Sequence, residues 1–253
     1  MAAKIIAIAN QKGGVGKTTT AINLSACIAH YGKRVLLVDV DPQGNATTGL
    51  GVNKNDLEKS TYDAIINDEP ANDIILKTSQ ENLFLMPSSI SLSGASVELV
   101  SLMSRESKLK LSLDEIRDDY DYIFIDCPPA LGLLTLNALT AADTVLVPIQ
   151  CEFFALEGLS QLLDTVKRVQ KYLNRKLTVE GVVMTMFDVR TNLCADVVEE
   201  VRKYFGDKVY KTMIPRNIRL GEAPGYGEPI IRYDSNSKGA EAYLALAREV
   251  LDS

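Results

Sequence analysis

The segment Lys12-Gly13-Gly14-Val15-Gly16-Lys17-Thr18 follows an apolar run at 5–9 and precedes a helix-like stretch at 19–31. A strand, a glycine-rich turn and a helix that begins at Gly-Lys-Thr form the context that a phosphate-binding loop requires. The glycines let several backbone N–H groups point at one anion, and the helix N-terminus adds partial positive charge. We therefore expect Lys17 to reach the β- and γ-phosphates of a nucleotide and the Thr18 hydroxyl to ligate Mg²⁺.

The loop departs from the common form G-x-x-x-x-G-K-[ST] at its first position. Gln11 stands where that form has a glycine, and a second lysine, Lys12, lies at the loop entrance. A glycine-rich turn with two solvated lysines is the alternative interpretation. The strand, the loop and the helix agree with one another, which favours the phosphate-binding interpretation.

Composition favours one large α/β domain that spans residues 1–253. The chain is 46% apolar and 24% charged, and its four cysteines are scattered without a C-x-x-C pair. Disulfide and metal frameworks are therefore not indicated, and a reducing cytoplasm fits. No signal peptide is apparent, and no apolar run reaches the roughly 18 residues of a membrane span. With a net charge of −6, any binding to nucleic acid must come from a local patch.

Short apolar runs alternate with helical patterns along the chain. The runs, rich in Val, Ile and Leu, are typical of strands buried on both faces of a parallel sheet. We expect strands at 4–10, 34–38, 83–86, 122–125, 144–149, 177–186 and 209–214. We expect helices at 19–31, 133–141, 156–173, 196–205 and 239–251, part of 93–118, and an irregular surface excursion at 44–78. This order predicts a doubly wound, mostly parallel α/β sheet with helices on both faces and sites at the carboxyl ends of the strands.

Three aspartates follow two of the expected strands. Asp39 directly follows the run 35–38 and Asp41 lies two residues further on, while Asp126 directly follows the run 122–125. Carboxylates at the ends of buried strands beside a phosphate loop bind the metal or orient the attacking water. We expect Asp126 to hold Mg²⁺, directly or through water. Asp41, in a segment with proline and glycine, is the better candidate to orient the lytic water and also to reach the metal through water.

With this phosphate loop and these aspartates, the sequence resembles the ParA/MinD group of deviant Walker A ATPases, and within it the Soj-type chromosomal ParA proteins. The matching segments are specific in composition and in order, and they extend over almost the whole chain. They are 11–20, 38–51, 120–136, 150–161, 184–192 and 214–233.

The resemblance implies a slow, Mg²⁺-dependent ATPase of the P-loop class. It implies an ATP-bound homodimer that sandwiches the nucleotides and binds double-stranded DNA without sequence preference. It further implies a ParB-type (Spo0J-like) partner that stimulates hydrolysis, a role in chromosome or plasmid partitioning, and a link to control of replication initiation. A cytoplasmic, nucleoid-associated protein is expected.

Residue by residue, the resemblance assigns Lys12 as the lysine that acts across the dimer, and Gly13 to the dimer interface. Lys12, Lys17, Asp41 and Asp126 are the implied catalytic set. The residues expected around the nucleotide are Lys12, Gly13, Gly14, Val15, Gly16, Lys17, Thr18 and Thr19, with Pro215, Arg216 and Asn217 at the adenine. Thr18 and Asp126 match the metal position, and Arg190 and Arg219 match arginines that contact DNA.

The residues themselves support DNA binding in part. The stretch 202–219 contains six basic residues and one acid, Asp207, in a chain of net charge −6. Such a strip gives salt-dependent, sequence-independent contacts to phosphates. A solvated helix face and loop is the alternative interpretation.

The nearest rival function is MinD-like cycling on a membrane, or another protein-positioning role. It would need a basic amphipathic tail. The last helical pattern instead places Glu241, Arg248, Glu249 and Asp252 beside an apolar face, and the sequence ends at Ser253. This mixture predicts a helix packed on the core. No cysteine pair suits an iron–sulfur cluster, and no DNA-reading domain has room before Lys12.

Overall fold

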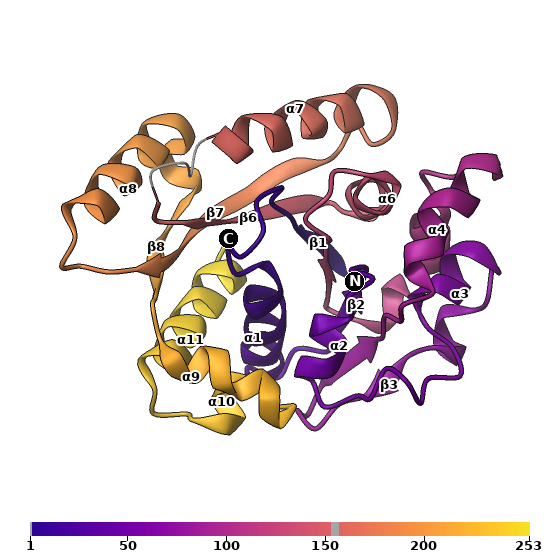
Figure 1. Cartoon of the computed structure of the whole chain (residues 1–253), viewed down its shortest axis with the longest axis horizontal. Coiled ribbons are helices and arrows are strands. Elements are labelled where there is room, and N and C mark those ends of the chain that lie inside the picture. Colours follow the sequence, from indigo (N-terminus) through magenta and orange to yellow (C-terminus); the bar gives the residue numbers. More distant parts are fainter. Residues whose placement is uncertain (1, 153–156) are drawn as a thin grey trace.

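The computed structural model describes residues 2–152 and 157–253; Leu156, which we expected to begin a helix, lies outside them. The chain builds one eight-stranded sheet with the order β3-β4-β2-β5-β1-β6-β7-β8 (Figure 1). The strands are β1 (Lys4–Ile8), β2 (Val35–Asp39), β3 (Leu76–Lys77), β4 (Leu83–Met86), β5 (Tyr122–Asp126), β6 (Thr144–Gln150), β7 (Thr178–Phe187) and β8 (Val209–Pro215). All neighbours pair in parallel except β3 and β4. The predicted doubly wound, mostly parallel sheet is confirmed.

Helices cover both faces of the sheet. They are α1 (Lys17–His30), α2 (Asn45–Gly49), α3 (Thr61–Ile66), α4 (Leu92–Glu98), α5 (Lys108–Asp114), α6 (Leu133–Ala141), α7 (Glu157–Tyr172), α8 (Asn192–Phe205), α9 (Ile218–Glu222), α10 (Ile230–Tyr233) and α11 (Lys238–Leu251). In Figure 1, α7 and α8 lie on one side of the sheet, and α1 and α11 lie on the other.

Each face of the sheet has its own apolar core. Ile5 and Ala7 of β1 contribute to the core beneath α4 to α8, whereas Ile6 and Ile8 contribute to the core beneath α1 and α11. Successive side chains of a strand point to opposite faces, so a strand between two helix layers must be apolar at every position. This requirement explains the unalternating runs of the sequence.

Three parts of the sequence-based prediction differ from the structure. The strand β3 was not predicted, because two exposed residues on an antiparallel edge carry no periodic signal. The pattern at 93–118 is two separate helices, α4 and α5. The helix predicted from residue 196 begins at Asn192, since Cys194 in its first turn is buried against the core. Residues 44–78 hold the short helices α2 and α3, as expected for an irregular excursion.

Candidate functional site: a phosphate loop beside two joined cavities

The loop between β1 and α1 lies at the carboxyl end of the sheet. Gly14 and Gly16 have φ values of 75° and 86°, the left-handed region that favours glycine. The Thr185 hydroxyl of β7 donates to the carbonyl of Val15 at 2.8 Å and fixes the loop to the sheet. The helix α1 begins at Lys17, so its first N–H groups have no partner within the helix. Free amides and the positive end of the helix thus face the same space.

Lys17 lies largely inside this loop. Its side chain is buried, and its Nζ donates to the carbonyl of Lys12 at 3.0 Å. Burial lowers the pKa of Lys17, while the nearby carboxyl groups of Asp126 and Asp41 oppose that shift. A cation held this way in low dielectric gains strongly from a phosphate, because few competing waters screen it.

Asp39 and Asp126 end two adjacent strands in register with one another. Both are fully buried. Asp39 accepts hydrogen bonds from the Thr47 backbone N–H at 2.8 Å, the Thr47 hydroxyl at 2.7 Å and the Asp41 N–H at 3.1 Å. Burial still raises the pKa of Asp39 to about 6. Asp39 therefore holds the segment after β2 in place and has little capacity left for a ligand.

Asp126 is in the opposite situation. Neither of its carboxylate oxygens has a hydrogen-bond partner among the residues that the structure describes. Burial and the charge of Asp39 raise the pKa of Asp126 well above its usual value; Thr18 and Lys17 oppose that rise, although the Thr18 hydroxyl does not reach hydrogen-bond geometry. A buried carboxylate without a partner is costly unless a cation or a metal-bound water satisfies it.

A cavity of about 420 Å³ opens in front of the loop. Four groups of predicted residues meet there: the glycines of the loop, Lys17, the hydroxyl residues Thr18 and Thr19, and Asp41. Asp41 is almost fully buried, and its Oδ1 accepts from the Gln43 N–H at 2.9 Å. Gln43, Asn45 and Pro129 also line this cavity; the sequence showed them only as parts of the segments after β2 and β5.

These residues fit a hard divalent cation bound together with phosphates. Mg²⁺ prefers oxygen ligands and is held by one or two carboxylates plus substrate phosphates. Asp126 supplies unsatisfied oxygens, while Thr18 and Asp41 line the adjoining cavity. Over the described part of the chain, no cluster of three or more His, Cys, Asp or Glu side chains suits a metal by itself. The donor set therefore favours a metal that arrives with the nucleotide.

A second, mainly apolar cavity of about 210 Å³ adjoins the first. The predicted adenine segment Pro215, Arg216 and Asn217 lines it. The Asn217 Oδ1 accepts from the Arg219 N–H at 2.9 Å and caps α9, which leaves the amide nitrogen for a ligand. The two cavities share Gly16, Thr19 and Met186. Their joined shape offers an apolar end and a phosphate-binding end.

Further lining residues of the apolar cavity were missed by sequence reasoning. They are Thr185, Met186, Ile214, Leu220, Gly221 and Tyr243. Tyr243 belongs to α11, and its hydroxyl lies 3.1 Å from the Thr20 hydroxyl of α1. The available signals were the matching segments 184–192 and 214–233, in which the resemblance assigned roles only to Arg190, Pro215, Arg216, Asn217 and Arg219.

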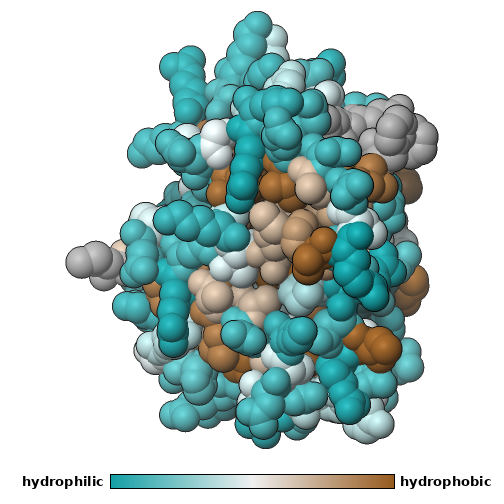
Figure 2. All heavy atoms as spheres, turned by 90° about the vertical axis from the view of Figure 1, so that its left-hand side faces the viewer, coloured by the Kyte–Doolittle hydropathy of each residue, from teal (hydrophilic) through white to brown (hydrophobic). Residues whose placement is uncertain are grey.

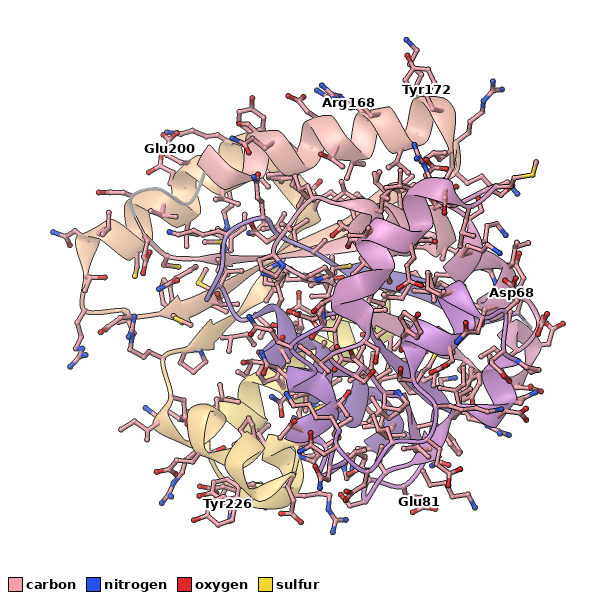
Figure 3. All side chains as sticks on the ribbon, turned by 45° about the vertical axis from the view of Figure 1, so that its right-hand side comes forward. Asp68, Glu81, Arg168, Tyr172, Glu200 and Tyr226 are labelled. Carbon is pink, nitrogen blue, oxygen red and sulfur yellow. The ribbon has the colours of Figure 1, made fainter. Side chains whose placement is uncertain are left out.

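The predicted basic strip is divided by the fold. The helix α8 and the strand β8 place Arg202, Lys203 and Lys208 at the amino end of β8, whereas Arg216 and Arg219 follow its carboxyl end. Lys203 pairs with Glu199 at 3.2 Å and with Glu200 at 3.1 Å; Figure 3 shows Glu200 pointing outward from α8. The stretch is therefore not one patch.

Arg190 and Arg219 lie outside both cavities. The Arg190 side chain is 86% exposed and pairs with Asp188 at 2.6 Å. Arg219 is 54% exposed and pairs with Glu222 at 2.9 Å and with Asp234 at 3.5 Å. Both lie on elements that follow the carboxyl ends of β7 and β8, the same edge as the phosphate loop. Each arginine keeps exposed N–H groups beside a neighbouring acid.

Comparison with known proteins identifies relatives over nearly the whole chain. An AAA domain model matches residues 3–179. The sporulation initiation inhibitor protein Soj of Bacillus subtilis is 63% identical over 247 residues, which cover 98% of both chains. The chromosome partitioning protein ParA of Myxococcus xanthus is 54% identical over 98% of this chain and 88% of its own length.

Solved structures share the fold. A cobyrinic acid a,c-diamide synthase of Mycobacterium smegmatis with bound ADP and magnesium has a TM-score of 0.87 and 38% identity, and the match covers 98% of this chain and 94% of that one. The septum site-determining protein MinD of Pyrococcus horikoshii, in complex with Mg-ADP, has a TM-score of 0.80 and 27% identity. That match covers 98% of this chain and 96% of the MinD chain.

Proposed function

The chain belongs to the Soj/ParA family of chromosome-partitioning ATPases, and from this premise we propose that its 253 residues form a single ATPase domain that acts in partitioning. The observation that carries the proposal is the pair of joined cavities, with Lys17, Thr18 and Asp41 at the phosphate end and Pro215 and Asn217 at the apolar end. This shape matches adenosine triphosphate, with an apolar base at one end and a polyanion at the other.

In the proposed reaction, water attacks the γ-phosphorus of ATP, and the bond from that phosphorus to the β–γ bridging oxygen breaks. ADP leaves with the bridging oxygen, and the proton of the water passes to an oxygen of the phosphate product. Lys17 and the loop amides neutralise the charge that develops on the phosphate oxygens. Asp41 accepts a hydrogen bond from the attacking water and orients it. Mg²⁺, which Thr18 and Asp126 would hold, supplies further neutralisation of the β- and γ-phosphates. Catalysis then consists of positioning and electrostatics.

We assign Gly13 to a homodimer interface that forms around ATP. An added Cβ at Gly13 would meet no atom within 4 Å, and its φ is not in the left-handed region. Nothing within the described part of this chain therefore requires glycine at that position. A requirement for a small residue would come from a partner subunit that approaches closely, with Lys12 of each subunit reaching the phosphates of the other.

The ATP-bound dimer is proposed to bind double-stranded DNA through Arg190 and Arg219. Two exposed arginines give weak, salt-dependent contacts to phosphates. A dimer links two such pairs, so the second contact becomes intramolecular and the affinity rises. Hydrolysis separates the subunits and removes the second contact. Binding to DNA thereby depends on ATP.

A ParB-type protein is the proposed partner that stimulates hydrolysis, and the protein would be cytoplasmic and associated with the nucleoid. Control of replication initiation is a further proposed role. The rival is MinD-like cycling on a membrane. Among the helices of residues 2–152 and 157–253, none combines the length and the hydrophobicity of a membrane span. The apolar face of α11 packs against α1 and β8, which favours a structural role for that helix.

The deciding experiment is binding to non-specific duplex DNA at two salt concentrations, with ATP, ADP or no nucleotide. ATP-dependent binding that weakens at high salt supports the proposal. Absence of binding in every state, by a protein that still hydrolyses ATP, would favour a MinD-like positioning role. Vesicles of anionic lipid with ATP are the matching test of that rival.

A further inference from the structure

Met186 has an unusual backbone conformation for its position. Its φ is 51°, although it belongs to the strand β7. In the described part of the chain, three other non-glycine residues have positive φ: Asp68, Asn82 and Ser104. All three are short polar residues in exposed turns or loops, where local hydrogen bonds make this conformation tolerable. Methionine has no such compensation, so the surrounding structure imposes the strain.

The strain changes the direction of one side chain. Successive residues of a regular strand point to opposite faces of the sheet. Thr185 and Met186 nevertheless both line the apolar cavity. The pairing of β7 with β8 also shifts register between Met184 and Phe187. The left-handed turn at Met186 thus brings a second, adjacent side chain to the site, next to the Thr185 hydroxyl that anchors the loop.

Met186 also lies at the junction of the two cavities. It lines both of them, together with Gly16 and Thr19. Gly16 and Thr19 belong to the loop and α1, whereas Met186 comes from β7. A ligand that fills both cavities must therefore pass between these two sides. In a nucleoside triphosphate, the group between the base and the phosphates is the ribose.

We infer that Met186 contacts the ribose of the bound nucleotide and fixes the position of the base relative to the triphosphate. This inference rests on the proposed function and deepens it. The half-buried thioether offers an adaptable apolar surface without a strong hydrogen-bonding group. It would recognise the C–H surface of the sugar, while the phosphate loop recognises the charge.

Figure 2 faces the side of β8, α8 and α9 and shows apolar residues gathered in its middle, between hydrophilic borders.

The test compares two ligands on the full chain, ATP and inorganic triphosphate, both with Mg²⁺. Met186→Gly removes the side chain while allowing φ of 51° without strain. We expect it to weaken ATP binding about tenfold, a loss typical of one buried apolar contact. Binding of inorganic triphosphate should stay within about twofold, and the melting temperature should not fall, because glycine relieves the strain.

Two further variants serve as controls. Met186→Leu conserves the apolar volume and should keep ATP affinity within about threefold of the original. Met184→Leu changes a fully buried methionine of the same strand that lines neither cavity, and should leave both affinities unchanged. The inference is overturned if Met186→Gly weakens both ligands equally or weakens neither. If the unmodified protein is folded and binds no ATP, the proposed function fails, and this inference fails with it.

Discussion

The Nζ of Lys12 lies 2.9 Å from the Oε2 of Glu152, so the entrance lysine is paired within its own chain. Glu152 follows the end of β6, and the Lys12 N–H is held by the Asn10 Oδ1 at 3.0 Å. The two side chains of the pair are 33% and 46% exposed. Exposed pairs of this kind contribute about 0–1 kcal/mol. Lys12 can therefore leave Glu152 at little cost when the phosphates of a partner subunit approach.

Lys12→Ala should keep ATP binding but weaken ATP-dependent dimerisation about tenfold or more, with turnover falling in parallel. The reason is that the lost ammonium would neutralise charge only in the partner's site. Sedimentation velocity with ATP measures the dimer, and phosphate release measures turnover. Lys77→Ala, an exposed lysine of β3 at the far edge of the sheet, is the matched control. A fully active monomeric Lys12→Ala protein would refute the action in trans.

Asp41→Ala should trap the ATP-bound dimer. Asp41 lines the phosphate cavity and is proposed to orient the water, so its loss slows cleavage without removing the groups that bind ATP. Size-exclusion chromatography with ATP should show a persistent dimer, and phosphate release should drop at least about a hundredfold. Lys17→Ala, which loses the phosphate contact, should stay monomeric as a control. An Asp41→Ala protein that remains monomeric with ATP contradicts the assignment.

Asp126→Asn should stabilise the protein in the absence of ligands. The carboxylate is buried without a hydrogen-bond partner, and its raised pKa shows that ionisation is penalised in the folded state. Removing that cost should raise the free energy of unfolding by about 1–3 kcal/mol, measured by urea denaturation with EDTA. The gain in ATP affinity that Mg²⁺ provides should be lost in the same variant. A less stable Asp126→Asn protein would mean that burying the carboxylate costs less than burying an amide at this position.

Arg219→Glu should abolish ATP-dependent DNA binding while leaving basal ATP hydrolysis unchanged. The substitution reverses a charge at the carboxyl edge of the sheet, outside both cavities. Lys208→Glu reverses a charge of the same basic run at the opposite end of β8 and should have little effect. Filter binding at two salt concentrations distinguishes the two variants. Equal losses from both would show that the whole basic stretch acts as one surface.

Local patterns predicted most of the sheet because its central strands, β1, β2, β5 and β6, are almost entirely buried between two layers of helices. The apolar runs at 122–125 and 133–141 needed no long-range information, and the predicted helix bounds at 133–141 match the structure. The edge strand β3 and the break between α4 and α5 depend on packing against other elements. Their residues carry no period that a sequence could reveal.

The phosphate loop can be predicted from local sequence alone, because the glycines, the lysine and the threonine proposed to bind phosphate are neighbours in the chain. The sequence also placed Asp39, Asp41 and Asp126 at strand ends, since an aspartate after a buried apolar run marks where a strand leaves the core. Which of these aspartates lacks hydrogen-bond partners depends on contacts between distant segments. Thr47 and the Asp41 N–H donate hydrogen bonds to the Asp39 carboxylate, whereas no group in the described residues donates one to Asp126.

The tertiary structure likewise decided the conformation of Met186 and the division of the basic run. Both depend on how β7 and β8 pair and where they end, which are contacts between residues far apart in sequence. Sites built from residues that are neighbours in the chain can thus be predicted from the sequence. The folded chain is needed to show which buried groups have hydrogen-bond partners, where the backbone is strained and which charges lie together. The reason is that these features depend on contacts between segments that are far apart in sequence.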